Sequence, residues 1–425
     1  MERARVRWPV AVVVAVVVAE VAVVLLRPRG GVIEPAPVRV ESYFSPSQIE
    51  RARDYERPQL MLYGGALVAE LALLALLVAR PPRRLRGSFR RPVLAGAATG
   101  AALSLAVCAA ALPFDAVAHE RARDAGLVTQ SWGGYAADQA KSWGIAAIIA
   151  AVGAAAALAL IRRFPRRWWM PGAVVVVAFG AATIYAGPVV LDPLFNTFKP
   201  LEGRARADVI ELARRAGVDV GQVYEIDASR RTTAANAYVT GLGKTKRVVL
   251  YDTLLENFKR DELRLVVAHE LGHVRYDDVP RGLLYLAIVA PFGMLAAAQL
   301  TRRMAPGGDS ENPRGPAFAG HVAGSGTPTS GPAILPALAL SVAVMSTSIT
   351  TISNQLSRRV EARADSYSLS LTQRPDAFIS LERRLATRNL SDPDPPGWVT
   401  FVLSTHPPVS ERIGIGEAYR RGRRP

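Results

Sequence analysis

The composition of this 425-residue chain excludes several classes of protein. Half of the residues are hydrophobic, and they stand in long apolar runs rather than spread along the chain as in a soluble protein. Lys and Arg number 52 against 36 Asp and Glu, a net charge of +16, with the excess in short arginine clusters beside the apolar runs. A nucleic-acid partner would instead require a basic stripe or a reading helix, so we expect none. The single cysteine, Cys108, excludes a disulfide framework and a cysteine-based zinc module.

Seven apolar runs reach the roughly 18–20 residues that a helix needs to cross a membrane. They are Pro9–Leu26, Leu60–Ala79, Val93–Leu112, Trp143–Ile161, Pro171–Leu191, Gly282–Leu300 and Pro332–Ile352. The last five contain no charged residue. Because a helix satisfies its own backbone polar groups in lipid, we predict a predominantly α-helical, multi-pass protein embedded in the lipid bilayer.

The first two spans have features of their own. Arg3, Arg5 and Arg7 precede the first span as in a signal peptide, but no small-residue cleavage site follows, so we predict a retained anchor. Glu20 and Glu70 lie near the middle of the first and second spans. Since a carboxylate is unfavourable in lipid, we expect both to face a partner or a water-filled interior. The alternative is that each is a protonated or paired structural group.

The spans divide the chain into four segments. Residues 1–191 carry five spans, 192–281 a small α+β segment, 282–356 two further spans, and 357–425 a helical tail with a proline-rich break at Asp392–Gly397.

Secondary structure in the α+β segment follows from its residue patterns. Apolar spacing predicts a helix over Arg206–Ala216. The runs VYEID, NAYVTG and RVVLYD predict strands, and the last two form a hairpin across LGKTK. Between the last two spans, Ala305–Thr329 is rich in Gly, Pro and Ser, so we expect a flexible loop with His321 as a solvated loop residue.

The sequence HELGH, His269–His273, carries the clearest chemistry. It lies in a stretch of helical periodicity, where residues four apart share one face. His269 and His273 can therefore present two imidazoles to one metal ion, with Glu270 beside the open coordination position. This is the arrangement of zinc metallopeptidases. A chance match is a poor explanation in a chain with only five histidines.

A catalytic zinc ion takes three protein ligands and one water, so a third ligand is required. The remaining histidines are His119, His321 and His406. A carboxylate is the better candidate, because SRRVEARADSY places Glu361 and Asp365 four apart on a predicted helix. One can bind the metal while the other bonds to a ligand histidine. Nearby arginines could hold these carboxylates in place: Arg358, Arg359 and Arg363. The alternative is a solvated helix end with ordinary ion pairs.

These motifs resemble those of a known family. HELGH, the upstream TAANAYVTGLGKTKRVVLYDTLL, the later SRRVEARAD and the tail STHPPVSERI occur in the order found in the type I CAAX prenyl protease family of integral-membrane zinc metallopeptidases. DPLFNTFKPL and the position of HELGH between the fifth and sixth spans resemble that family too. The resemblance is strong from about Gly187 onward and rests on the span pattern before it.

The resemblance implies a metal site and a fold. His269, His273 and Glu361 would bind one Zn²⁺ per chain, Glu270 would be the general base, and Asp365 would support one of the two histidines. Seven helices would enclose a large water-filled chamber, next to a small α+β metallopeptidase region.

The resemblance also implies contacts to substrate. His406 would stabilise the oxyanion of the tetrahedral intermediate. Asn236, Ala237 and Tyr238 would bind the substrate: Asn236 would hold its backbone, and the strand that follows would pair with an extended peptide.

The sequence therefore predicts a zinc-dependent membrane endopeptidase that cleaves membrane or membrane-associated polypeptides. A zinc transporter should carry its ligands within the spans, near the midplane, whereas these ligands lie just outside them. A catalytically silent scaffold would have no use for Glu270.

Residue patterns and family resemblance give different predictions for the side of the membrane that carries the site. The loops on the opposite side hold two arginine clusters: Arg83, Arg84, Arg86, Arg90 and Arg91, then Arg162, Arg163, Arg166 and Arg167. By the positive-inside rule those loops are cytoplasmic, which favours an extracytoplasmic active site. The resemblance instead implies a site open to the cytosol, as in eukaryotic members of the family.

Overall fold

The computed structural model describes residues 10–85, 87, 89–240, 246–305 and 331–425. Some predicted features fall outside these residues. They are the arginines before the first span, the first residue of that span, Pro9, Arg86, the turn of the predicted hairpin, and most of the Gly/Pro-rich loop with His321.

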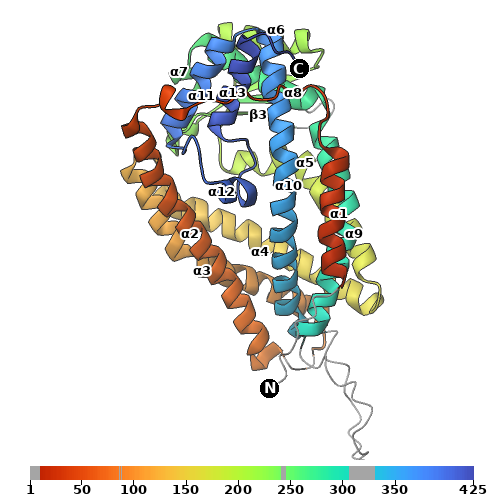
Figure 1. Cartoon of the computed structure of the whole chain (residues 1–425). Coiled ribbons are helices and arrows are strands. Elements are labelled where there is room, and N and C mark those ends of the chain that lie inside the picture. The colour runs from red at the N-terminus through yellow and green to blue at the C-terminus, as the bar shows by residue number, and fades with distance from the viewer. Residues whose placement is uncertain (1–9, 86, 88, 241–245, 306–330) are drawn as a thin grey trace, which may run out of the picture.

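Long apolar helices make up most of the described chain (Figure 1). Six are long and apolar enough to cross a membrane: α2 (Pro46–Ala79), α3 (Pro92–Asp124), α4 (Trp132–Arg163), α5 (Trp169–Val190), α9 (Asp278–Met304) and α10 (Leu335–Thr372). A shorter apolar helix of 17 residues, α1 (Val10–Leu26), adds to them. Each predicted span falls on one of these helices, so the predominantly α-helical, multi-pass membrane fold is confirmed.

Several of these helices extend beyond their apolar runs. α2 begins at Pro46, well before the predicted Leu60, because Ser45 caps it. The Ser45 hydroxyl accepts from the Gln48 N–H at 3.2 Å, and the Gln48 side chain accepts from the Ser45 N–H at 2.9 Å. α10 likewise continues past Ile352 into the segment that carries Glu361 and Asp365. One continuous helix therefore joins a span to the predicted site.

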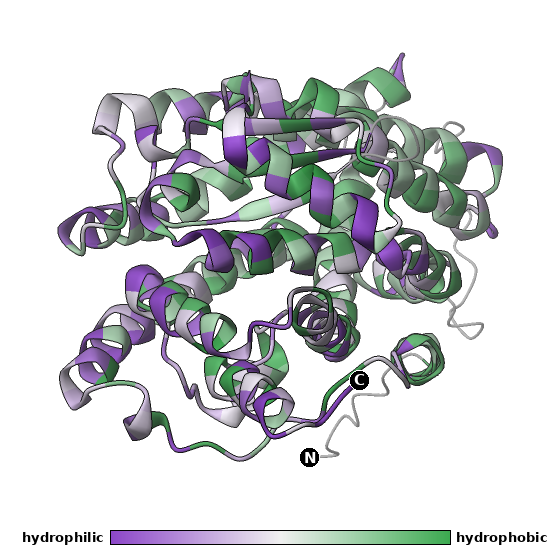
Figure 2. Ribbon diagram, turned by 90° about the horizontal axis from the view of Figure 1, so that it is seen from above, coloured by the Kyte–Doolittle hydropathy of each residue, from purple (hydrophilic) through white to green (hydrophobic). Residues whose placement is uncertain are grey.

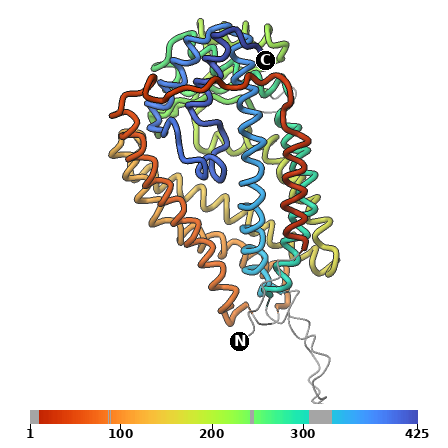
Figure 3. The backbone as a smooth tube through the Cα atoms, in the orientation of Figure 1, coloured from red at the N-terminus to blue at the C-terminus, as the bar shows by residue number. Residues whose placement is uncertain are grey.

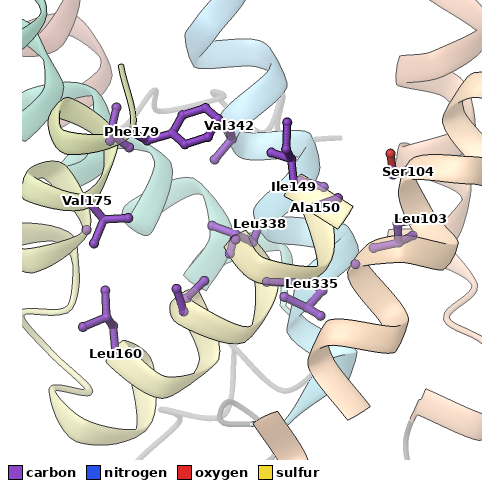
Figure 4. Close-up of a pocket in the computed structure, with 18 of the residues that line it drawn as sticks. Leu103, Ser104, Ile149, Ala150, Leu160, Val175, Phe179, Leu335, Leu338 and Val342 are labelled. Atoms are coloured by element: carbon purple, nitrogen blue, oxygen red, sulfur yellow. The ribbon is translucent and has the colours of Figure 1, made fainter. Parts of the chain in front are cut away.

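The spans converge at one end and diverge at the other. α1, α9 and α10 pack together, while α2 and α3 lean away from them toward the end that carries the sheet (Figure 3). Near the converging end lies an almost wholly apolar cavity of about 530 Å³ (Figure 4). Its labelled lining comes from α3, α4, α5 and α10: Leu103, Ser104, Ile149, Ala150, Leu160, Val175, Phe179, Leu335, Leu338 and Val342. None of the residues that line it belongs to the HELGH segment.

A four-stranded sheet lies at the diverging end. Its strands are β1 (Phe198–Pro200), β2 (Gln222–Ile226), β3 (Ala237–Thr240) and β4 (Arg247–Tyr251), in the order β1-β2-β4-β3. β2 and β4 are parallel, and β3 pairs with β4 antiparallel, as the predicted hairpin requires. β1 was not predicted, because three residues that include Lys199 and Pro200 are too few to form an alternating pattern. β3 forms one edge of this sheet.

Shorter helices lie between or just after the strands in the chain, or follow α10. They are α6 (Gly203–Ala216), α7 (Asp252–Asn257), α8 (Arg260–Arg275), α11 (Pro375–Asn389), α12 (Gly397–Val402) and α13 (Val409–Arg420). α6 confirms the predicted helix and ends at Gly217, whose φ of 66° suits glycine. Val209, Leu250 and Leu271 meet in the core between α6, β4 and α8. Seen from this end, hydrophilic residues alternate with hydrophobic ones along many of the helices and strands (Figure 2).

The connection between α1 and α2 crosses over this end of the molecule (Figure 3). The Ile33 N–H donates to Ser366 Oγ at 2.9 Å, and the Ala36 N–H donates to the Gly414 carbonyl at 3.0 Å. A Cβ at Gly414 would lie 2.4 Å from the Ala36 carbonyl oxygen, so this contact requires glycine. The first helix is thereby tied to α10 and α13.

Candidate active site

The HELGH residues lie on α8. Its first turn carries Asp261 and Glu262, and the Lys259 N–H donates to Glu262 Oε2 at 2.8 Å, which satisfies a free donor at the helix start. His269 and His273 project from one face, as predicted, with their Nε2 atoms 3.2 Å apart.

The close approach of α10 to α8 brings the third candidate ligand. A Cβ at Gly272 would lie 3.3 Å from the Ala364 Cα and 3.2 Å from the Tyr367 ring, tighter than ordinary contact. Glycine at this position therefore lets the two helices meet. Glu361 Oε2 lies 3.1 Å from His269 Nε2, and Glu361 Oε1 lies 3.6 Å from His273 Nε2.

The three side chains fit a tetrahedral metal ion. Their ligand atoms lie within 4.8 Å of one another, and no other such group of His, Cys, Asp or Glu occurs in the part of the chain that the structure describes. Zinc bonds of roughly 2.0–2.1 Å imply ligand separations of about 3.3 Å. The 3.2 Å between the two histidine nitrogens, and the 3.1 and 3.6 Å from them to the two oxygens of Glu361, are close to that value. The exposed fractions of 12% for His269 and Glu361 and 21% for His273 leave one face of the cluster open.

A carboxylate orients each histidine from behind. His269 Nδ1 lies 2.8 Å from Asp365 Oδ1, and His273 Nδ1 lies 3.0 Å from Asp278 Oδ2. Such a bond keeps the hydrogen on Nδ1 and leaves Nε2 free for a metal. Residue spacing alone does not decide which histidine Asp365 contacts, and in the structure it is His269. Asp278 was missed, although its place five residues after His273, at the start of α9, could have suggested it.

The expected arginine partners of Glu361 and Asp365 were wrong. Arg358 donates to the carbonyls of Thr400 and Ser404, Arg359 to Glu34, and Arg363 to Asp278. Arg359 and Arg363 are each two residues from Glu361, and side chains at that spacing leave a helix on different faces.

Arg412, on α13, holds Asp365 instead. Its Nη2 donates to Asp365 Oδ1 at 2.6 Å and its Nε to Oδ2 at 2.8 Å. Burial disfavours the charged guanidinium, but the attraction of Asp365 and Glu382 outweighs burial and raises the pKa of Arg412. The guanidinium is therefore a permanent positive charge beside Asp365.

Glu270 faces the edge strand. Its Oε2 accepts from the Val239 N–H on β3 at 3.3 Å. Burial raises the pKa of Glu270, which suits a group that must hold a proton for part of a reaction. The predicted base thus lies between the histidine pair and the free edge of the sheet.

The predicted substrate residues lie along the same edge. Asn236 is exposed, and its Oδ1 accepts from the Ala237 N–H at 2.9 Å. The Ala237 side chain is buried in the core, and the Tyr238 hydroxyl bonds to Asp192 Oδ2 at 3.3 Å. Contacts from Ala237 to a substrate would therefore come from its backbone.

His406 reaches the cluster from the loop between α12 and α13. Its Nε2 lies 3.2 Å from Glu361 Oε2, Thr405 Oγ1 lies 3.0 Å from its Nδ1, and its side chain is 58% exposed. Of the other histidines that the structure describes, His119 stacks on Tyr135, with ring centroids 4.1 Å apart, and is not part of the cluster.

This fold and site define an integral-membrane metallopeptidase. Two family models match the chain: peptidase family M48 over residues 201–415, and the CAAX prenyl protease N-terminal region of five membrane helices over residues 33–197. The first covers half of the chain. The chain belongs to peptidase family M48, and the resemblance to CAAX prenyl proteases is confirmed.

Known relatives agree with this assignment. The chain is 33% identical over 316 residues to the uncharacterized metalloprotease YhfN of Bacillus subtilis (strain 168), which covers 74% of this chain and 71% of that protein. It is 30% identical over 239 residues to the CAAX prenyl protease 1 homolog of Oryza sativa subsp. japonica, 55% of this chain and 52% of that one. The match to CAAX prenyl protease 1 of Saccharomyces cerevisiae is 38% over 132 residues, 30% of this chain and 29% of that one. The matches thus span about half or less of these two CAAX prenyl proteases.

A solved structure shares the whole fold. The crystal structure of S. mikatae Ste24p superimposes with a TM-score of 0.74 at 21% identity, covering 97% of this chain and 99% of that one. The protein is a multi-pass membrane metalloendopeptidase.

Proposed function

We propose that this metallopeptidase uses zinc to cleave membrane or membrane-associated polypeptides. The observation that carries the proposal is the cluster of His269, His273 and Glu361 beside Glu270. The nitrogen and oxygen donors, and their separations, suit a four-coordinate zinc ion with one position left for water. When bound, Zn²⁺ would polarise that water and the scissile carbonyl as a Lewis acid.

The protein's own residues would move the protons and bind the developing charge. Glu270 would take a proton from the attacking water and deliver it to the leaving amine. The exposed His406 would donate a hydrogen bond to the oxyanion. Asp365 and Asp278 would keep the Nε2 atoms of His269 and His273 aimed at the ion.

Strand addition to β3 would align the substrate. The outward N–H groups of Ala237 and Val239 bond to the side chains of Asn236 and Glu270 rather than to β4. An extended peptide that pairs with this edge would lie beside Glu270, and Asn236 would turn its amide to the peptide backbone.

The position of the site supports the proposed substrate class. Glu361 stands on a helix whose earlier part is a membrane span, and the spans diverge toward the end that carries the cluster (Figure 1). A polypeptide at the membrane can therefore reach the site, and the proposal does not require that it carry a prenyl group. The site would be assembled from two segments of the chain. Residues 192–281 include α8, which carries both histidines and the base. Residues 357–425 include Glu361 on α10 and Arg412 on α13.

The two alternatives are less favoured. A zinc transporter should hold its ligands near the membrane midplane, whereas His269 and His273 lie on α8, which is not among the span-length apolar helices. A silent scaffold would not need a buried carboxylate aimed at a free strand edge beside a metal-binding triad.

The test uses full-length protein purified in detergent. We expect about one zinc ion per chain by elemental analysis. We also expect the protein to cleave a quenched fluorescent peptide, and this cleavage should stop when a chelator is added and return when zinc is added back. Glu270→Gln is the matched control, because it should bind zinc without turnover. Protein without zinc, or cleavage unaffected by chelation, contradicts the proposal.

A further inference from the structure

Buried charges continue behind His269, away from the open face of the cluster. Asp365, which bonds to His269, is fully buried. Arg412 binds both of its oxygens and, through Nη1, reaches Glu382 Oε2 at 2.8 Å. Glu382 stands on α11 and is 1% exposed. A line of contacts therefore runs from Glu382 through Arg412 and Asp365 to His269.

All three guanidinium nitrogens of Arg412 face a carboxylate oxygen of Asp365 or Glu382. Nε and Nη2 face Asp365, and Nη1 faces Glu382. Since the guanidinium is a rigid planar fork, fixing Nη1 fixes the direction of the other two nitrogens. Without Glu382, the Nη1 donors would be buried without that partner, and the fork would turn to satisfy them.

Glu382 contributes little stability by its own bonds. Among the residues that the structure describes, its Oε1 has no hydrogen-bond partner, and a buried carboxylate so poorly satisfied is unfavourable compared with an apolar side chain. Burial also raises the pKa of this carboxyl, against the attraction of Arg412. We therefore expect Glu382 to act by orienting Arg412 rather than by stabilising the fold.

We propose that Glu382 is a positioning residue of the active site, which fixes Arg412 so that Arg412 holds Asp365 against His269. Glu382 touches neither substrate nor metal, and acts by keeping His269 Nε2 aimed at the ion. This inference rests on the proposed zinc site.

The test measures zinc affinity by competition with a chromophoric chelator, on folded full-length protein. We expect Glu382→Ala to bind zinc ten- to a hundredfold more weakly, the range typical of residues that support a metal ligand from behind. Glu382→Gln keeps a side-chain oxygen of the same reach, which can still face Arg412 Nη1, so its zinc affinity should stay within about threefold of wild type.

Glu417→Ala is the matched control for a purely structural effect. Glu417 is a 2% exposed carboxylate on α13, bonded to Tyr43 and Arg420 and not to the cluster. It should lower the unfolding temperature and leave zinc affinity unchanged. Equal zinc affinity of Glu382→Ala and wild type, or an equal loss in Glu417→Ala, overturns the inference.

A second variant covers the case in which Glu382→Ala fails to fold. Arg412→Lys keeps the charge, but a single ammonium cannot bridge two carboxylates in a fixed plane, so zinc affinity should fall at least tenfold. Unchanged affinity in Arg412→Lys overturns the inference. A wild-type protein that binds no zinc would instead contradict the proposed function itself.

Discussion

Gly272 and Ala364 are the point at which α8 and α10 touch, and their contact sets the distance between the histidine pair and Glu361. A Cβ on Gly272 would lie 3.3 Å from the Ala364 Cα, where the neighbour is backbone and cannot rotate away. The two helices would have to separate by a few tenths of an ångström. Metal bonds depend on distances of that order.

Gly272→Ala should therefore weaken zinc binding and lower kcat/KM at least tenfold. A helical Gly→Ala change is otherwise favourable by up to about 1 kcal/mol, so the loss would not come from helix propensity. Gly282 on α9 is the control, since a Cβ there meets nothing within 4 Å. Gly282→Ala should keep activity, and wild-type zinc affinity in Gly272→Ala would contradict the argument.

Removal of any metal ligand should abolish zinc binding. His269→Ala, His273→Ala and Glu361→Ala each leave two protein ligands, too few for a stable catalytic site. Glu270→Gln should retain the ion and lose turnover, because the base is not a ligand. Metal analysis and peptide cleavage on the same preparations separate the two outcomes. If Glu361→Ala keeps a full complement of zinc, the third ligand lies elsewhere, with His406 the next candidate at 3.2 Å from Glu361.

Loss of Asp278 should weaken zinc binding as much as loss of Asp365. Asp278→Ala removes the partner of His273 Nδ1 and leaves the buried Arg363 without its carboxylate. We expect zinc affinity to fall ten- to a hundredfold. Asp277→Asn tests the neighbouring acid, because its φ of 52° suits asparagine and its side chain is exposed. That control should bind zinc normally, and a normal affinity in Asp278→Ala would remove Asp278 from the site.

His406 and Asn236 should act on turnover and not on the metal. His406→Ala removes a donor to the oxyanion, a loss of roughly 10²–10³ in kcat in other enzymes. Asn236→Ala should slow cleavage less, because the free edge of β3 still pairs with the peptide. Both variants should fold and hold zinc. Wild-type rates in both would show that the substrate and oxyanion roles belong to other residues.

Local patterns in the sequence predicted the parts of the site that depend on one helix. The histidines of HELGH are four apart, so helical geometry alone brings their Nε2 atoms together. Glu361 is 92 residues from His269, and its assignment needed both a carboxylate pair on a predicted helix and the family resemblance. Arg412 and Glu382 carry no such pattern, because their contacts exist only once α11 and α13 pack behind α10.

The membrane-spanning helices also have features that local patterns predict and features that they do not. Run length predicted where each apolar helix lies, since the membrane sets that length. The polar starts of α2 and α4 were not predicted, because they depend on capping by Ser45 and Ser131 rather than on hydrophobicity. Such a cap consists of one or two local hydrogen bonds, and serine is common outside helix starts.

The last prediction concerns the side of the membrane. The α2–α3 and α4–α5 loops lie at the end opposite the sheet (Figure 1). The first carries Arg83, Arg84, Arg90 and Arg91. At the second, Arg162 and Arg163 end α4, and Arg166 and Arg167 follow in the loop. Because the positive-inside rule weighs short loops most and largely disregards long segments, these loops should be cytoplasmic and the site should face outward. The arginines at the catalytic end, such as Arg358 and Arg359, make the bias moderate, but both have protein partners. A reporter active only outside the cytoplasm, fused to the C-terminus, should therefore be active, and the same reporter inserted between Arg163 and Arg166 should be silent. Activity of a cytoplasm-specific reporter at the C-terminus would instead place the zinc site on the cytosolic side.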